Sequence, residues 1–138
     1  MKRIVKRPKL YFWDTGLACY FARVLDVESL KAGYLKGPMV ETYMVNEVLK
    51  TYRNAKLESP FYYYRDSNNV EIDLVMVKDG QVSLIECKFG TQFGWDDIKA
   101  MARGIPTQYP ITAKGVLCLT EKLYPIEEGI YAIPVSSI

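Results

Sequence analysis

Four charged residues interrupt one hydrophobic stretch of the sequence, VEIDLVMVKDGQVSLIECKFG, at residues 70–90. Carboxylate oxygens are ligands that hard divalent cations prefer, and a lysine on the same face supplies one further positive charge. A solvated polar patch is the plain alternative, but the apolar flanks and the Glu-x-Lys spacing favour a cation site. The four residues are Glu71, Asp73, Glu86 and Lys88.

The geometry of this stretch follows from its turn, because Asp79-Gly80 favours a two-residue type I′ hairpin. In that register Asp73 lies opposite Glu86, and like charges in such a position are destabilising. Glu71 lies opposite Lys88, so all four charged side chains are predicted on one face, with a cation between the two acids. The other face is predicted to pack on a core through Val70, Ile72, Leu74, Met76, Ile85, Cys87 and Phe89.

The composition is that of one globular domain, with 138 residues of which 49% are hydrophobic and 13% aromatic. No apolar run approaches the roughly 20 residues needed to span a bilayer, and no signal peptide is evident. Cys19, Cys87 and Cys118 lack metal-ligand spacing, so we predict reduced core cysteines and a cytoplasmic protein. The absence of histidine excludes Ser-His-Asp chemistry, Cys-His chemistry and imidazole-bound zinc.

The net charge of +2 hides an asymmetry, because five of the 18 basic residues lie within the first nine. The rest of the chain has 13 basic and 16 acidic residues, a net charge of −3. Such an arm can bind nucleic-acid phosphates, or it can be a flexible or truncated end. Since it runs directly into KLYFWDTGL, we expect the chain to be a fragment of a longer protein. The arm contains Lys2, Arg3, Lys6, Arg7 and Lys9.

The first part of the chain predicts two helices. Asp14 or Thr15 can cap a short helix, and Pro38 is suited to begin a second one that runs to about Tyr52. Glu41 lies on the apolar stripe of the second helix. A carboxylate on that face needs a partner.

The rest of the chain predicts strands at residues 61–65, a hairpin at 70–90, a helix at 95–103, and strands at 114–120 and near 129–135. The core order is helix, strand, strand, strand, helix, strand. It predicts an α/β fold with a mixed central sheet flanked by helices. Tyr62 to Tyr64 could stack on bases, but we favour core or half-buried positions for them, and equally for Trp13 and Trp95.

Glu41, Asp73 and Glu86-Cys87-Lys88 resemble the signature of the PD-(D/E)XK nuclease superfamily, whose restriction-endonuclease-like αβββαβ core has the predicted element order. Ile72 stands where that signature has proline. A closer resemblance is to the C-terminal domain of unknown function 4143 of prokaryotic AAA+ family ATPases, although Walker motifs are absent from this sequence. It is carried by the segments KLYFWDTGLACYF, GPMVETYMVNEVLK, YYYRDSNNVEIDLVM and IECKFG, and covers nearly the whole chain from Pro8 onward.

This resemblance implies a site for Mg²⁺ or Mn²⁺ held by Asp73, Glu86 and the main-chain carbonyl of Cys87. Glu41 would complete the shell directly or through water. Lys88 would position or activate the attacking water and stabilise the charged phosphate. The implied activity is cleavage of DNA by a metal-dependent endonuclease or exonuclease.

Two supporting residues are less specific. Glu71 could orient Lys88 or form a plain surface ion pair, and Arg65 could reach a phosphate, although a solvated arginine is the favoured interpretation. The alternative function is that of a nuclease-fold module with weak or no catalysis. Such a module would bind DNA or assemble with the ATPase part of the same full-length chain, and it could form an oligomer. The net negative body favours this second function, because it attracts DNA poorly.

Overall fold

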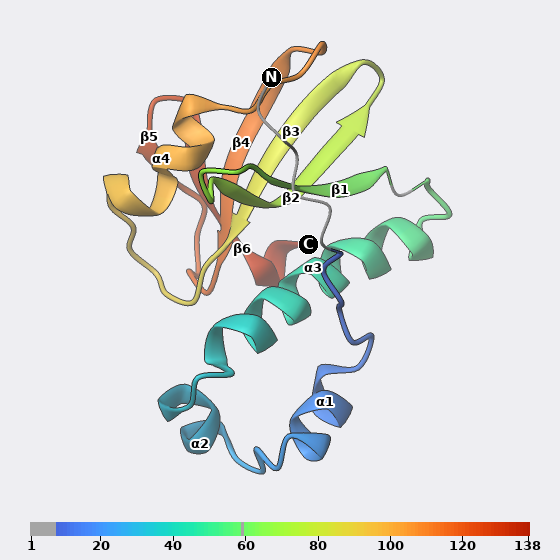
Figure 1. The fold of residues 1–138 in the computed structure, drawn as a ribbon, viewed down its shortest axis with the longest axis vertical. Helices are drawn as coiled ribbons and strands as arrows, with labels where there is room; N and C mark the ends of the chain where they lie inside the picture. The colour runs from blue at the N-terminus through green and yellow to red at the C-terminus, as the bar shows by residue number, and fades with distance from the viewer. Residues whose placement is uncertain (1–7, 59) are drawn as a thin grey trace.

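A six-stranded mixed sheet runs through the computed structural model, which describes residues 8–58 and 60–138 (Figure 1). The strand order is β1-β2-β3-β4-β6-β5. β1, β2 and β3 pair antiparallel, β4 is parallel to β3 and β6, and β5 is an antiparallel edge. The strands are β1 Phe61–Arg65, β2 Glu71–Lys78, β3 Gln81–Cys87, β4 Ile111–Cys118, β5 Tyr124–Glu127 and β6 Ile130–Pro134.

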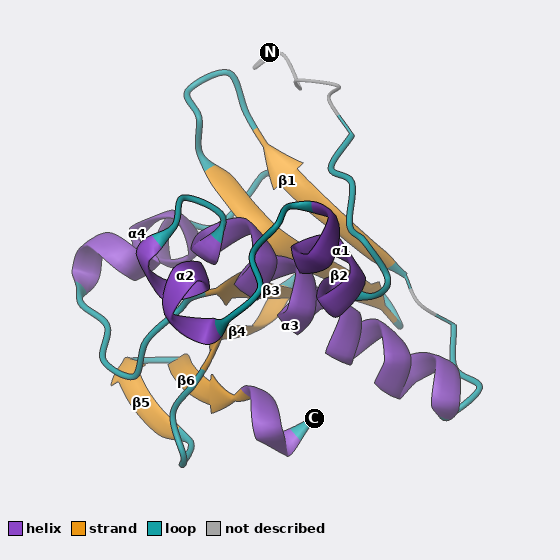
Figure 2. Ribbon diagram, turned by 90° about the horizontal axis from the view of Figure 1, so that it is seen from below, coloured by secondary structure: helices purple, strands orange, loops and turns teal. Residues whose placement is uncertain are grey.

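Helices cover both faces of this sheet and extend beyond it. α1 and α2 lie below α3 in Figure 1, on its far side from the sheet, and Figure 2 shows them from below. None of the described helices is long and apolar enough to cross a bilayer. The helices are α1 Thr15–Phe21, α2 Val27–Ala32, α3 Lys36–Asn54 and α4 Trp95–Arg103, and a 3-10 turn, Val135–Ser137, follows β6.

The predicted order of elements is confirmed by α3, β1 to β3, α4 and β4. The predicted mixed sheet flanked by helices is confirmed too, and it is compatible with a restriction-endonuclease-like core. β5 and α2 were not predicted, because segments of four and six residues are too short to show a periodic pattern.

The core consists of two clusters, one on each face of the sheet. Ile98 and Met101 of α4 pack with Val75, Val82, Leu84, Val116 and Ala132. Met44, Val45 and Val48 of α3 pack with Leu74 and Leu117. The hairpin is hydrophobic on both faces because each face is covered by a helix.

The predicted hairpin turn is confirmed. Asp79 and Gly80 have φ of 51° and 71°, as a type I′ turn requires, and Lys78 pairs with Gln81. The antiparallel pairing then continues to Leu74 and Ile85.

The prediction of a single apolar face on β2 is wrong. Ile72 packs in the α4 cluster with Val75, whereas Leu74 packs in the α3 cluster. A β-bulge explains the change. Tyr62 of β1 pairs with Val75, but two residues later Tyr64 pairs with Ile72, so β2 holds one extra residue between the pairs. Such a bulge changes the direction of the side chains that follow it, here at Asp73, inside the candidate site.

The aromatic prediction is only partly confirmed. Tyr64 is half-buried against the α4 cluster, as predicted for a sheet tyrosine. Tyr62, Trp13 and Trp95 are exposed. Tyr62 lies on the edge strand β1, and the two tryptophans lie at helix starts, where no second layer covers them.

The cysteines are free thiols, of which Cys118 is buried and Cys19 and Cys87 are partly exposed. The prediction of core positions therefore holds fully for Cys118. The predicted cap of the first helix is confirmed, since the Leu17 N–H donates to Asp14 Oδ1 at 2.9 Å.

The turn that sets the hairpin register can be tested with two glycine variants. Gly80→Ala should lower the free energy of unfolding by about 1 to 2 kcal/mol, because an alanine is strained at positive φ. Gly37→Ala is the matched control, since its Cβ would meet no atom within 4 Å in α3, and it should stabilise by up to about 1 kcal/mol. Urea unfolding measures both, and a Gly80→Ala variant as stable as the wild type would contradict the turn assignment.

Candidate functional site

The residues singled out in the sequence line one pocket of about 640 Å³. Glu41 comes from α3, Asp73 from β2 and Glu86 from β3, and Lys88 follows directly after β3. The structure thus brings together residues that lie up to 47 positions apart, between Glu41 and Lys88. The predicted residues that line the pocket are Glu41, Glu71, Asp73, Glu86, Cys87 and Lys88, and α4 adds Lys99 and Arg103.

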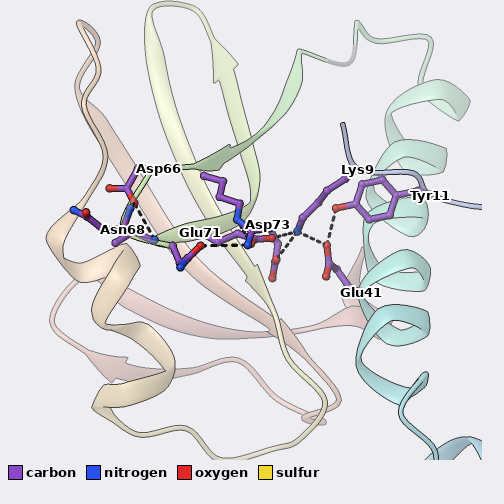
Figure 3. A network of polar contacts seen from close by, with 10 residues as sticks. Lys9, Tyr11, Glu41, Asp66, Asn68, Glu71 and Asp73 are labelled. Carbon is purple, nitrogen blue, oxygen red and sulfur yellow. Dashed lines mark hydrogen bonds and ion pairs between the residues drawn. The ribbon is translucent and has the colours of Figure 1, made fainter. Parts of the chain in front are cut away.

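A lysine that was not predicted here lies among the carboxylates (Figure 3). The Lys9 Nζ donates to Glu41 Oε1 at 2.8 Å and to Asp73 Oδ1 at 3.2 Å. It also forms an ion pair with Glu71 Oε1. Only 21% of the Lys9 side chain is exposed. One ammonium group therefore contacts three carboxylates, which we call the acidic cluster: Glu41, Glu71 and Asp73.

The inward-facing Glu41 has the partners that its position required. Besides Lys9, the Tyr11 hydroxyl donates to Glu41 Oε1 at 2.6 Å. Burial, followed by the hydrogen bond to Glu41, raises the pKa of Tyr11, so this phenol stays neutral. Burial lowers the pKa of Lys9, but its hydrogen bonds to Glu41 and Glu71 outweigh this effect, and the net pKa is raised. Lys9 is therefore a permanent cation in this site.

Lys9 and Tyr11 belong to the N-terminal segment, residues 8–14, which forms neither helix nor strand. Its backbone is held by the Asn46 side chain of α3, whose Nδ2 donates to Phe12 O at 2.5 Å and to Trp13 O at 3.2 Å. The Arg53 guanidinium lies 4.9 Å from the Trp13 ring centroid. All of these partners lie on α3, so this helix fixes the N-terminal segment over the acidic cluster.

The two opposed acids, Asp73 and Glu86, are reconciled by a proton. Asp73 Oδ2 accepts a hydrogen bond from the Cys87 N–H at 2.9 Å. Glu86 is only 6% exposed. Burial and then the Asp73 charge raise the pKa of Glu86 to about 8, although Lys88 and Lys9 oppose the shift. Burial and the neighbouring Asp73 charge therefore favour the protonated form of Glu86.

The divalent cation expected between Asp73 and Glu86 stays a prediction, and the cation that the structure places on Asp73 is the Lys9 ammonium group. Among residues 8–58 and 60–138, no three His, Cys, Asp or Glu side chains are arranged to hold a metal ion. The carboxylate donors themselves suit a hard divalent cation. The residues therefore fit a divalent cation by the chemistry of their donor atoms. The Lys9 ammonium group is hydrogen-bonded to the oxygens of Glu41 and Asp73 that such an ion would bind.

Of the two predicted roles of Glu71, orienting Lys88 or forming a plain ion pair, the structure supports the ion pair. Glu71 contacts Lys9 instead, and its other oxygen lies 3.7 Å from the Nε of Arg65. Arg65 is partly exposed and also donates to Asn69 Oδ1 at 3.3 Å. It is thus a structural partner of Glu71 at the pocket edge, close to the solvated arginine that the sequence favoured. The adjacent turn is closed by Asp66, which accepts hydrogen bonds from the N–H groups of Asn68 and Val70 (Figure 3).

The basic arm is divided by the structure. Lys2, Arg3, Lys6 and Arg7 lie outside the described residues. Lys9 was predicted to contact nucleic acid with them, but it is bound in the acidic cluster. Sequence spacing could not reveal this, because 32 residues separate Lys9 from Glu41 and 64 separate it from Asp73. The one available signal was the need of Glu41 for a buried partner.

Residues 36–138 match the family described as "Domain of unknown function (DUF4143)". The chain belongs to this family. No curated protein and no solved structure matches it. In this DUF4143 domain, Glu41, Asp73, Glu86 and Lys88 lie within the matched residues, whereas Lys9 and Tyr11 precede them.

The shared proton predicts a pH dependence for the stability of this DUF4143 domain. Glu86 ionises near 4.5 in the unfolded chain but only near 8 in the folded one. Its protonated form stabilises the fold fully below about pH 4.5, and this contribution is lost as the pH rises to about 8. Glu86→Gln cannot ionise. The variant should therefore gain stability relative to the wild type as the pH rises, by up to about 1.4 kcal/mol per pH unit.

Urea unfolding of both proteins between about pH 5 and pH 8 measures this difference directly. Glu47→Gln is the matched control, because Glu47 pairs with Lys50 outside the pocket. A difference between Glu86→Gln and the wild type that does not vary with pH would contradict the shared proton.

Proposed function

We propose that this domain is a PD-(D/E)XK nuclease-like module that cleaves DNA phosphodiester bonds with Mg²⁺ or Mn²⁺, as part of a longer AAA+ family ATPase. One observation carries the proposal. Carboxylates from a helix and two strands share a pocket with a lysine that follows the second strand. They are Glu41, Asp73, Glu86 and Lys88.

The donor set supports a divalent cation of the hard type, because its side-chain ligands are all carboxylates. Asp73 and Glu86 would hold the ion with the Cys87 carbonyl, and Glu41 would complete the shell. Glu86 must lose its proton to act as a ligand, and a nearby divalent charge lowers the pKa of a carboxyl. The chemistry that such an ion supplies when bound is neutralisation of phosphate charge and acidification of a bound water.

The protein's own groups do the remaining work. Lys88 lines the pocket, and its charge lowers the pKa of Glu86. The ammonium group could therefore contact a phosphate oxygen bound beside the acids. There it would stabilise the charge that grows in the transition state and position the attacking water. No histidine is needed, and the chain has none.

α4 lines the pocket with side chains of both signs. Lys99 and Arg103 lie one turn apart on this helix, and Asp96 and Asp97 line the same pocket. Lys99 Nζ pairs with Asp96 Oδ1 at 2.9 Å. These four side chains of α4 therefore add no net charge to the lining, and the proposed phosphate contact falls to Lys88.

A second function is supported by the Lys9 contacts. Each carboxylate of the acidic cluster already contacts an ammonium group, and burial favours the protonated form of Glu86. A nuclease-fold module with little turnover, used for DNA binding or assembly with the ATPase, would need nothing more.

A cleavage assay separates the two functions. Plasmid and single-stranded DNA are incubated with this chain and with its longer parent in Mg²⁺, Mn²⁺ or chelator. Cleavage should require the metal and fall at least about 100-fold in Lys88→Ala, because a charge that stabilises the transition state is lost. Lys78→Ala is the matched control, since Lys78 is an exposed lysine at the other end of the same hairpin.

Equal cleavage rates for Lys88→Ala and the wild type would contradict the proposed role of Lys88 in the reaction. No cleavage by either chain under any metal and nucleotide condition would favour the assembly module.

A further inference from the structure

We propose that Lys9 and a divalent cation compete for Glu41 and Asp73 of the acidic cluster, so that the N-terminal segment closes the site when it is docked and must leave when metal binds. This inference concerns regulation of the same pocket and rests on the proposed function. Its starting point is that the Lys9 ammonium group is bound by Glu41, Glu71 and Asp73 at once. Its three N–H donors are matched by three carboxylates.

Simultaneous occupation is excluded by the atoms that both cations use. A divalent cation binds carboxylate oxygens at about 2.0 to 2.6 Å. Glu41 Oε1 already accepts hydrogen bonds from both Lys9 and Tyr11, at 2.8 Å and 2.6 Å. Asp73 Oδ1 is bound by Lys9, and Asp73 Oδ2 by the Cys87 N–H. A metal ion at these oxygens would also lie beside a positive ammonium group, with only partly screened repulsion.

The N-terminal segment can leave without unfolding the core. It makes no strand pairing with the sheet. Leu10 is 84% exposed, and Phe12 and Trp13 are about half exposed. Its attachments are the Lys9 ion pairs to α3 and β2, the bonds from the buried Asn46 side chain to Phe12 O and Trp13 O, and the packing of Tyr11 against the α3 cluster. Release would therefore break these contacts and uncover the α3 cluster at Tyr11, while the buried members of both clusters keep their helix and sheet contacts.

Competition is reciprocal. If docking of the N-terminal segment weakens metal binding by some factor, metal must weaken docking by the same factor. Trp13 reports docking, because its ring lies against Arg53 and Lys50 of α3 and its carbonyl is bound by Asn46. The chain has only one other tryptophan, Trp95, which is exposed at the start of α4. A Trp95→Phe background leaves Trp13 as the single emitter.

The test combines two measurements in that background. Isothermal titration with Mg²⁺ gives the affinity, and Trp13 emission gives the docking of the N-terminal segment. Lys9→Met keeps the length of the side chain but removes its charge, so it should bind Mg²⁺ at least about tenfold more tightly. Its emission should already match that of the Mg²⁺-loaded wild type. Lys31→Met is the matched control, because Lys31 pairs with Glu28 on exposed α2, and its Mg²⁺ affinity should equal that of the wild type.

A second variant covers the case in which Lys9→Met fails to fold. Tyr11→Phe keeps the ring and removes only the hydroxyl that donates to Glu41. It should tighten Mg²⁺ binding in the same direction, by a smaller factor.

Two negative outcomes are distinct. If the wild type and the folded variants bind Mg²⁺ equally, or if Trp13 emission does not change on Mg²⁺ binding, competition is overturned while the proposed metal site stands. If neither the wild type nor the variants bind Mg²⁺, the metal site itself is refuted, and the competition with it.

Discussion

The interaction on which the site depends is the balance of its buried negative charge. Six carboxyl groups line one pocket, and four of them, Glu41, Glu71, Asp73 and Glu86, come from α3, β2 and β3, where positive charge or protonation must offset the cost of burial and mutual repulsion. Lys9 contacts the acidic cluster, and burial beside Asp73 favours the protonated form of Glu86. This requirement explains why a residue near the start of the chain is bound to the centre of the sheet.

The fold meets this requirement through two devices. The first is the bulge in β2, which separates Ile72 and Leu74 onto opposite faces and sets the direction of Asp73 between them. The second is α3, which packs on the sheet through Met44, Val45 and Val48. The same helix places Glu41 in the pocket and binds the N-terminal segment through hydrogen bonds from Asn46. The site is thus built where one helix, a distorted strand and an extended segment meet.

The sequence was informative where the signal is local. The Asp79-Gly80 turn, the helix at residues 95–103 and the need of Glu41 for a partner all follow from neighbouring residues. Two features could not be read in this way. The bulge depends on how β1 pairs with β2, and the Lys9 contacts join residues 32 and 64 positions apart. A lysine in a basic N-terminal arm predicts phosphate binding, and only the tertiary fold turns it toward the acids.

The central claim is that one set of carboxylates binds either Lys9 or a divalent cation. Crystal structures of the protein grown without divalent cations and with Mn²⁺, using the anomalous signal of manganese, test it most directly. The account predicts Lys9 Nζ bound to Glu41 and Asp73 without Mn²⁺. With Mn²⁺, it predicts an anomalous peak at these carboxylates and Lys9 beyond hydrogen-bond distance from them. Manganese bound to Glu41 and Asp73 with Lys9 still in place would contradict it.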